Sequence, residues 1–248
     1  MERICFLFSI VIICSCSSLK TYTSLESALH NPNEVQRLKI SNKDLRKLPQ
    51  EISQFKNLKE LILFRDHLDT LSASIGELSQ LEKLAVSSCR LRYIDPAIGK
   101  LKNLKMLHLQ NNQLTQIPSS IGDLTSLQEL KLFNNYIDSI PPSIGNLENL
   151  EYLYLNGNNL RSLPSTVGNM TGLRFLYVER NDMYSLPKEM GNLTSLVELD
   201  VANAGALLKV PESMCSIRTL ETLTVDPTIV IPYCMESRIS SHFRIVVK

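Results

Sequence analysis

The sequence lacks an excess of charge of either sign. Its 26 Lys and Arg residues nearly balance its 25 Asp and Glu residues, so the formal net charge of the 248-residue chain is +1. A protein that holds nucleic acid on an extended basic surface carries a clear positive excess. The balance therefore argues against a strongly basic nucleic-acid-binding surface and against an acidic tail, and we expect no nucleic-acid partner.

Catalytic and metal-binding signatures are also missing. The histidines are scattered along the chain, and none stands at the spacing of metal ligands. They are His30, His67, His108 and His242. No GxSxG, GxxxxGK[ST] or HExxH motif is present. We therefore predict that the protein is not an enzyme and that it holds no metal and no cofactor.

The amino terminus lacks an apolar run of membrane-spanning length. Ile4–Ile13 is apolar but falls short of the roughly 20 residues that a spanning helix needs. Arg3 precedes this run and small residues follow it, which is typical of a targeting segment. We therefore assign residues 1–18 to a leader and predict an exported chain.

The leader leaves two interpretations open. Ile13-Cys14-Ser15-Cys16 resembles a bacterial lipobox, with an aliphatic residue three places before Cys16, although Cys14 is an unusual occupant of the middle position. This resemblance implies lipidation at Cys16, which would be the only link to a membrane and would place the protein at the cell surface or outer membrane. The alternative is an ordinary signal peptide cut near Ser18, which would give a secreted protein.

What the sequence does contain is a repeat. The stretch 104–126 recurs with almost unchanged spacing in units that begin at Leu127, Leu150 and Leu173. Apolar residues fill the first, fourth, sixth and eleventh places, Asn fills the ninth, and Ile or Leu followed by Pro fills the fourteenth and fifteenth. A fixed period of this kind is typical of stacked repeat architectures.

The spacing within a unit predicts a short strand. Leu107 and Leu109 fall on one face of it, and Met106, His108 and Gln110 point the other way, because side chains alternate along a strand. Stacked copies would form a parallel sheet on the inside of a curved solenoid, with a continuous core behind it.

Three further residue types recur at fixed places. The Asn amides should bond to the backbone of neighbouring turns, the prolines should mark the turn onto the convex side, and the glycines should permit the tight return to the next strand. These residues are Asn112, Asn135, Asn158 and Asn181; Pro118, Pro141, Pro164 and Pro187; and Gly122, Gly145, Gly168 and Gly191.

With residues such as LPSTVGNM (Leu163–Met170), the pattern resembles a leucine-rich repeat of the 23-residue LPxxIGxL type. The resemblance implies an α/β solenoid, a horseshoe with a parallel concave β-sheet and short helical, 3-10 or irregular convex segments. Eight units would span residues 35–219, beginning at Val35, Leu58, Leu81, Leu104, Leu127, Leu150, Leu173 and Leu196. A fold of this kind occurs with many functions, so it does not identify the function of this chain.

The segments on either side of the repeats should cap them. In the amino-terminal cap, residues 19–34, we expect a helix over Tyr22–His30 with a capping box of Thr23 and Glu26. Residues 220–248 should form a partial repeat and a second cap, with a last strand at 220–225 and an edge strand at Ile245–Val247. The eighth unit has one extra residue within 204–208, which predicts a bulged loop.

The cysteines outside the leader have separate interpretations. In an exported chain Cys215 and Cys234 are the natural disulfide, which would tie the carboxy-terminal cap to the last turn. A metal site is the competing interpretation, but these cysteines lack partners at ligand spacing. Cys89 stands at an Asn place, where it is either a reactive thiol or a small buried residue, and we favour burial.

The candidate binding residues lie on the inner face of the sheet, at the third, fifth, seventh, eighth and tenth places. Rings gather there although aliphatic residues already fill the core positions: Phe133, Tyr136, Tyr152, Tyr154, Phe175 and Tyr177. Matching places should form the rows Lys131–Tyr154–Tyr177–Asp200 and Glu129–Tyr152–Phe175–Glu198. The charged flanks would be Lys131, Glu179, Arg180 and Asp200. Aromatic clusters with a polar rim are typical of protein interfaces, but rings also suit strands and stack with one another.

The preferred hypothesis is an exported or surface-displayed module that binds a protein partner on its concave face. The segment Thr23–Ser41 and the LPxxIGxL units resemble secreted leucine-rich repeat lipoproteins of spirochaetes, which implies a role in attachment. One alternative is an intracellular leucine-rich repeat scaffold for signalling assemblies, against which the apolar leader speaks. The other alternative is an enzyme or a ubiquitin-ligase effector. Such effectors have shorter repeats than this chain, and their additional catalytic domain has no room here.

Overall fold

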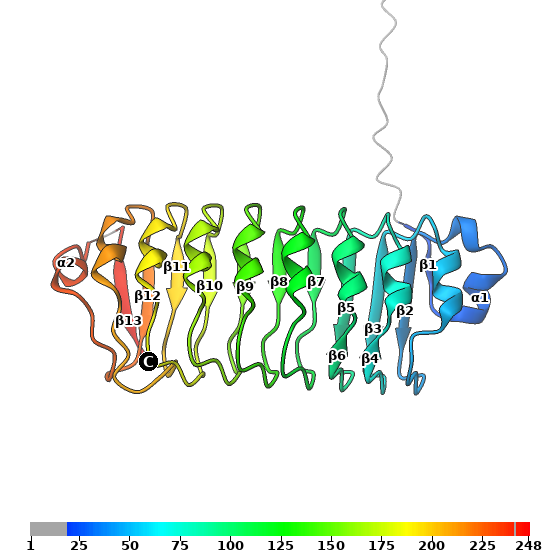
Figure 1. Cartoon of the computed structure of the whole chain (residues 1–248), viewed down its shortest axis with the longest axis horizontal. Coiled ribbons are helices and arrows are strands. Elements are labelled where there is room, and N and C mark those ends of the chain that lie inside the picture. Colours follow the sequence, from blue (N-terminus) through cyan, green and yellow to red (C-terminus); the bar gives the residue numbers. More distant parts are fainter. Residues whose placement is uncertain (1–18, 241) are drawn as a thin grey trace, which may run out of the picture.

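The chain winds into a row of similar turns, each of which contributes one strand and one short helix (Figure 1). The computed structural model describes residues 19–240 and 242–248, so the predicted leader and Cys16 lie outside the described residues. The strands follow one another along one side of the row and the 3-10 helices along the other. A single file of turns that does not close on itself is the predicted solenoid.

The strands pair in parallel throughout the main sheet. It has 11 strands in the order β1 (Thr21–Tyr22), β2 (Arg37–Ser41), β3 (Glu60–Phe64), β5 (Lys83–Ser87), β7 (Met106–His108), β8 (Glu129–Lys131), β9 (Tyr152–Tyr154), β10 (Phe175–Tyr177), β11 (Glu198–Asp200), β12 (Thr222–Val225) and β13 (Arg244–Val247). The short strands β4 (Thr70–Leu71) and β6 (Tyr93–Ile94) form a separate parallel pair.

The helices are short and lie opposite the sheet or at the ends of the row. The α-helices α1 (Leu25–Leu29) and α2 (Tyr233–Glu236) occupy the two ends (Figure 1). The 3-10 helices are η1 (Pro32–Glu34), η2 (Gln50–Gln54), η3 (Ala73–Glu77), η4 (Pro96–Lys100), η5 (Ser119–Asp123), η6 (Pro142–Asn146), η7 (Ser165–Asn169), η8 (Lys188–Asn192) and η9 (Glu212–Ser216).

The core runs between the sheet and the 3-10 helices. Leu104, Leu107 and Leu109 are fully buried, whereas Met106 between them is 36% exposed. The predicted register is therefore confirmed: the apolar places face the interior and the alternate places face the opposite surface, which we call the sheet face. The repeated prolines each immediately precede a 3-10 helix, as at Pro118 before η5 and Pro187 before η8.

The recurring Asn residues form a buried ladder that joins neighbouring turns. The Asn135 Nδ2 donates to the carbonyl oxygens of Leu109 in the preceding turn (3.0 Å) and Leu132 in its own (2.9 Å). Its Oδ1 accepts the backbone N–H of Leu114 at 3.1 Å. Asn112, Asn158 and Asn181 repeat this arrangement. The predicted role of the amides is therefore confirmed.

Cys89 takes the ladder place in an earlier turn and is fully buried. Its backbone N–H donates to the Asn112 Oδ1 at 3.0 Å, and its thiol donates to the Ser87 carbonyl oxygen at 3.2 Å. Burial raises the pKa of the thiol, which keeps it protonated and unreactive. The structural interpretation of this cysteine is the one observed.

The glycines act differently from the sequence-based prediction. They lie within the 3-10 helices, and of all glycines only Gly157 has a positive φ, so the predicted role of a tight return is wrong for this set. A Cβ at Gly191 would come within 2.6 Å of the Ser213 carbonyl oxygen in the next turn, and one at Gly122 would overlap the Ser143 carbonyl. These positions need glycine because adjacent helical turns touch there.

The amino-terminal cap is shorter than predicted. Tyr22 lies in β1, which pairs with β2, and α1 begins only at Leu25. The N-cap is Ser24, whose hydroxyl accepts the backbone N–H of Ser27 at 3.1 Å, so the predicted capping box of Thr23 and Glu26 is wrong. The strand forms because the edge of β2 offers backbone partners that a longer helix would leave unpaired.

The carboxy-terminal end matches the sequence more closely. Phe175 pairs with Glu198, but Glu198 pairs with Thr222, a step longer by the one residue predicted within 204–208. In that bulge Leu207 has φ +55° and is 72% exposed. The edge strand β13 is present, and a disulfide joins Cys215 of η9 to Cys234 of α2, with a Cα–Cα distance of 6.0 Å.

The ladder predicts a specific pattern of stability. Asn135→Ala should lower the free energy of unfolding by about 2–3 kcal/mol, because it leaves a buried N–H and two buried carbonyls without their partner. Equilibrium denaturation in urea measures this loss. Asn146→Ala, at an exposed position in η6, is the matched control and should change stability by less than about 0.5 kcal/mol. Equal losses in the two variants would contradict the ladder.

The disulfide predicts a local effect at one end. Replacing Cys215 and Cys234 together by Ser should lower stability by about 3 kcal/mol, because the bond closes a loop of 19 residues in the unfolded chain. Amide hydrogen exchange should accelerate in η9, β12 and α2 and stay unchanged near η5. Uniform acceleration along the whole solenoid would show instead that the bond stabilises every turn.

Candidate binding surface

Four rings stand together on the sheet face, and we call them the aromatic slab: Tyr152 and Tyr154 from β9, Phe175 and Tyr177 from β10. Parallel pairing places Tyr152 beside Phe175 and Tyr154 beside Tyr177. The first pair stacks with ring centroids 4.8 Å apart and planes 3° apart, and the second at 4.9 Å and 9°. These separations equal the spacing of adjacent strands, so the sheet itself sets the stacking.

Stacking at this spacing determines which parts of the rings are exposed to a partner. Each ring partly covers the face of its neighbour, so the slab turns ring edges and hydroxyl groups outward. All four side chains are half-buried while the intervening Leu153 and Leu176 are buried. The slab is therefore an outward surface and not part of the interior. Ring edges and Tyr hydroxyls favour edge-to-face contact with partner rings and hydrogen bonds to partner oxygen atoms.

Charged side chains close the side of the slab that faces β8. Lys131 lies 5.2 Å from the Tyr154 ring centroid and forms a 2.7 Å salt bridge with Glu129. His108 from β7 contacts the same carboxylate at 2.8 Å. Burial alone would raise the pKa of Glu129, but the hydrogen bonds from Lys131 and His108 outweigh it and hold that pKa below its usual value.

The side of the slab that faces β11 carries acidic residues. One of them, Asp200, is bound by Lys248, a contact that the sequence did not indicate. Asp200 is only 4% exposed and accepts a 2.6 Å bond from the Lys248 ammonium group. Asp200 is therefore not an available charged flank as predicted, because a cation already covers it. Burial raises the pKa of the Tyr177 hydroxyl, and the negative charge of Glu198 raises it further, so this hydroxyl is a proton donor.

The structure brings together only part of the predicted set. The two predicted rows are present as strand register: Lys131, Tyr154, Tyr177 and Asp200 in one, and Glu129, Tyr152, Phe175 and Glu198 in the other. Phe133 is half-buried beyond the end of β8, and Tyr136, 56% exposed, lies further along the chain. These two rings make no stacking contact with the slab among the described residues.

Two predicted charged residues lie after β10. Arg180 is exposed and has φ +55°. Glu179 is half-buried, and its Oε2 has no hydrogen-bond partner among residues 19–240 and 242–248. Burial raises the pKa of Glu179, and the nearby charge of Asp200 raises it further. This oxygen is itself buried, so it is not exposed to a partner at the surface.

Sequence reasoning missed His108 and Lys248. A signal existed for His108, because it stands at the fifth place of its unit and continues the row of Lys131 and Tyr154 by one strand. No comparable signal existed for Lys248, since its contact depends on how β13 pairs with β12. In the part of the chain that the structure describes, no three His, Cys, Asp or Glu side chains lie together as metal ligands would. Within the same residues no helix has the length and apolar character to cross a bilayer.

Comparison with known proteins gives a family match for the central turns. The protein-family model described as "Leucine-rich repeat region" matches residues 95–177. A comparison with the curated proteins gives no match. Among solved structures, a leucine-rich repeat protein of Leptospira interrogans is similar at 24% identity and a TM-score of 0.45, over 92% of this chain and 76% of that one.

Two plant receptors are similar in fold. The ectodomain of the Arabidopsis thaliana receptor kinase GASSHO1/SCHENGEN3, in complex with CASPARIAN STRIP INTEGRITY FACTOR 2, has 26% identity and a TM-score of 0.62 over 84% of this chain and 28% of that one. The plant peptide hormone receptor RGFR1, in complex with RGF2, has 28% identity and a TM-score of 0.68 over 85% of this chain and 35% of that one. The chain thus spans about a third of each receptor chain.

The parallel sheet, the 3-10 helices and the repeating turns agree with these matches. The predicted fold class is confirmed. The chain contains a leucine-rich repeat region, and its fold is that of the leucine-rich repeat solenoids.

Proposed function

We propose that this chain is an exported, non-enzymatic module that binds a protein partner on its sheet face through the aromatic slab. The observation that carries the proposal is the gathering of four rings on a surface whose interior is already filled by aliphatic residues. Clustered aromatic side chains with charged neighbours are the composition that protein interfaces enrich.

Two further observations support this proposal. The similar plant receptors are described in complexes with RGF2 and with CASPARIAN STRIP INTEGRITY FACTOR 2, so this fold presents surfaces on which such ligands bind. Charged side chains flank the slab, namely Lys131, which lies over the Tyr154 ring, and the exposed Arg180. A partner would therefore find both apolar ring edges and charged groups at one place.

Export is the second part of the proposal. Disulfides persist in oxidising compartments and are rare in the cytosol, so the Cys215–Cys234 bond favours an exported protein over an intracellular scaffold. The apolar run Ile4–Ile13 agrees with that placement. Lipidation at Cys16 would hold the chain on a membrane surface, and the repeats would then project from it.

The binding proposal predicts a loss that stability does not explain. Tyr154→Ala and Tyr177→Ala should each weaken partner binding by about 2 kcal/mol or more, roughly 30-fold in Kd. Photo-crosslinking from position 156, beside the slab, would capture the partner, and biolayer interferometry with that purified partner would give Kd. The lost stacking should cost about 0.5–1.5 kcal/mol of folding stability, which leaves the fold intact.

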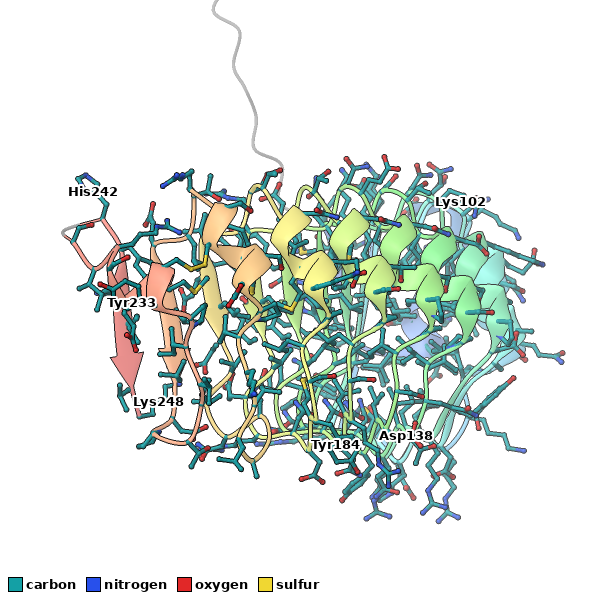
Figure 2. The ribbon with its side chains drawn as sticks, turned by 60° about the vertical axis from the view of Figure 1, so that its left-hand side comes forward. Lys102, Asp138, Tyr184, Tyr233, His242 and Lys248 are labelled. Carbon is teal, nitrogen blue, oxygen red and sulfur yellow. A yellow bond between two sulfur atoms is a disulfide. The ribbon has the colours of Figure 1, made fainter. Side chains whose placement is uncertain are left out.

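The controls separate the ring from its surroundings. Tyr154→Phe keeps the stack and removes only the hydroxyl, so it should retain most of the affinity. Tyr184→Ala removes a ring that is 75% exposed and lies at the lower edge of the solenoid (Figure 2), away from the sheet face, and it should have no effect. Unchanged Kd values for both Tyr154→Ala and Tyr177→Ala would place the binding site elsewhere.

The lipid anchor gives a separate prediction. Metabolic labelling of a bacterial host with an alkyne fatty acid should label the full chain, and Cys16→Ala should abolish the label. Cys14→Ala is the matched control and should keep the label, because it leaves the modified residue in place. Labelling that persists in Cys16→Ala, or that is absent from the wild-type chain, would reject the anchor and leave a freely secreted protein.

A further inference from the structure

The outer edge of the last strand is open. β13 pairs with β12 on one side, and among the described residues no strand pairs with its other side. The backbone N–H groups of Arg244 and Lys248 donate to carbonyl oxygens of the preceding turn, both at 2.9 Å. Because backbone groups alternate in direction along a strand, the N–H and C=O groups of Ile245 and Val247 point away from β12. The edge of β13 therefore presents backbone groups that could pair with another strand.

The apolar interior is also incomplete at this edge. Val247 pairs with Val225, which is 1% exposed, yet Val247 itself is 61% exposed. Residues at the same place in earlier strands, such as Leu63 and Val201, are fully buried. The row of core side chains therefore ends in an exposed valine. A further strand with apolar side chains on its interior face would bury that valine, which is favourable.

The opposite edge of the sheet is covered. α1 lies beyond β1 at that end (Figure 1), and Tyr22, the core-facing residue of β1, is only 8% exposed. At the carboxy-terminal end α2 is joined by the disulfide to η9, so α2 covers the helical side of the last turn and not the outer edge of β13 (Figure 2). With one open edge per copy, two copies can join in a closed pair, but they cannot add further copies in a row.

The open edge is complementary to itself. When two copies meet edge to edge about a two-fold axis beside Val246, their β13 strands run antiparallel. Ile245 then lies opposite Val247 of the second copy, and each residue donates its N–H to the carbonyl oxygen of the other. The same rotation joins the two core rows, because the side chains of Ile245 and Val247 both lie on the interior face of the sheet. Hydrogen bonding and burial are therefore satisfied in one arrangement.

The charges of β13 are compatible with this pairing. The arrangement sets Arg244 opposite Lys248 of the second copy, and opposed cations in a sheet repel one another. The Lys248 ammonium group, however, is bound by the Asp200 carboxylate at 2.6 Å, so its charge is compensated within its own copy. Between these two cations, residues 245–247 are uncharged and β-branched, which is typical of strands that pair readily.

We propose that the protein forms a two-fold dimer, in which the β13 strands of two copies pair antiparallel and continue one sheet across the interface. The edge of β13 does not include the aromatic slab, so the dimer is independent of the proposed protein-binding function. The rotation keeps both sheet faces on the same side of the joined sheet. A dimer would therefore present two slabs in one direction, and a partner with two matching sites would bind it with avidity.

Sedimentation velocity of the full chain over a dilution series should show a reversible monomer–dimer equilibrium. Val247→Pro should weaken dimerisation by about tenfold or more in Kd, because it removes an outward N–H and leaves the bonds to β12 in place. Val247→Lys should have a similar effect, since it places a charge in the joined core row. Tyr93→Lys is the matched control: it replaces a side chain that is 46% exposed, in β6, and should leave Kd unchanged. Thermal unfolding should show that each variant remains folded.

A cysteine at the two-fold axis tests the register. In the proposed dimer the two copies of residue 246 lie directly opposite each other, at a separation that a disulfide can span. Mild oxidation should therefore link Val246→Cys into a covalent dimer and leave Tyr93→Cys monomeric. A wild-type chain that stays monomeric at every concentration would overturn the proposal. A dimer that Val247→Pro does not weaken, or equal crosslinking of the two cysteine variants, would also overturn it, because another surface would then join the copies.

Discussion

The structure depends on the buried Asn amides that join the middle turns to their neighbours. A single turn cannot bury its own apolar side chains or pair all of its backbone groups, so it has no independent stability. The Asn135 side chain meets three of those backbone groups, from its own turn and the turn before it. These amides fix how far each strand is shifted along its neighbour, which sets the parallel register. The register in turn sets which side chains point out from the sheet face.

The packing of the turns limits which residue types each position can hold. Positions facing the core accept only apolar residues, and positions such as Gly191 accept no side chain because the next helical turn lies against them. The sheet face meets neither limit. The rings on β9 and β10 are therefore residues that the fold does not require at those places.

Much of the architecture was predictable from the sequence, because the period of the repeat records the register directly. The pairing of Tyr154 with Tyr177 and the burial of Leu107 follow from spacing alone. The amino-terminal cap was less predictable. Ser24 and Thr23 are both acceptable N-caps, and only the pairing of Tyr22 with β2 decides between them. The bond between Lys248 and Asp200 was beyond sequence reasoning, since it links residues 48 positions apart across a strand outside the repeat.

The two ends of the solenoid are closed by unequal means. At the carboxy-terminal end a covalent bond between η9 and α2 holds the last turn. At the amino-terminal end the described residues cover the first turn with β1, α1 and η1, and no disulfide joins them. In a stack held by nearest neighbours, opening starts at whichever end costs least and moves inward. The solenoid should therefore unravel from its amino-terminal turns while its carboxy-terminal turns keep their order.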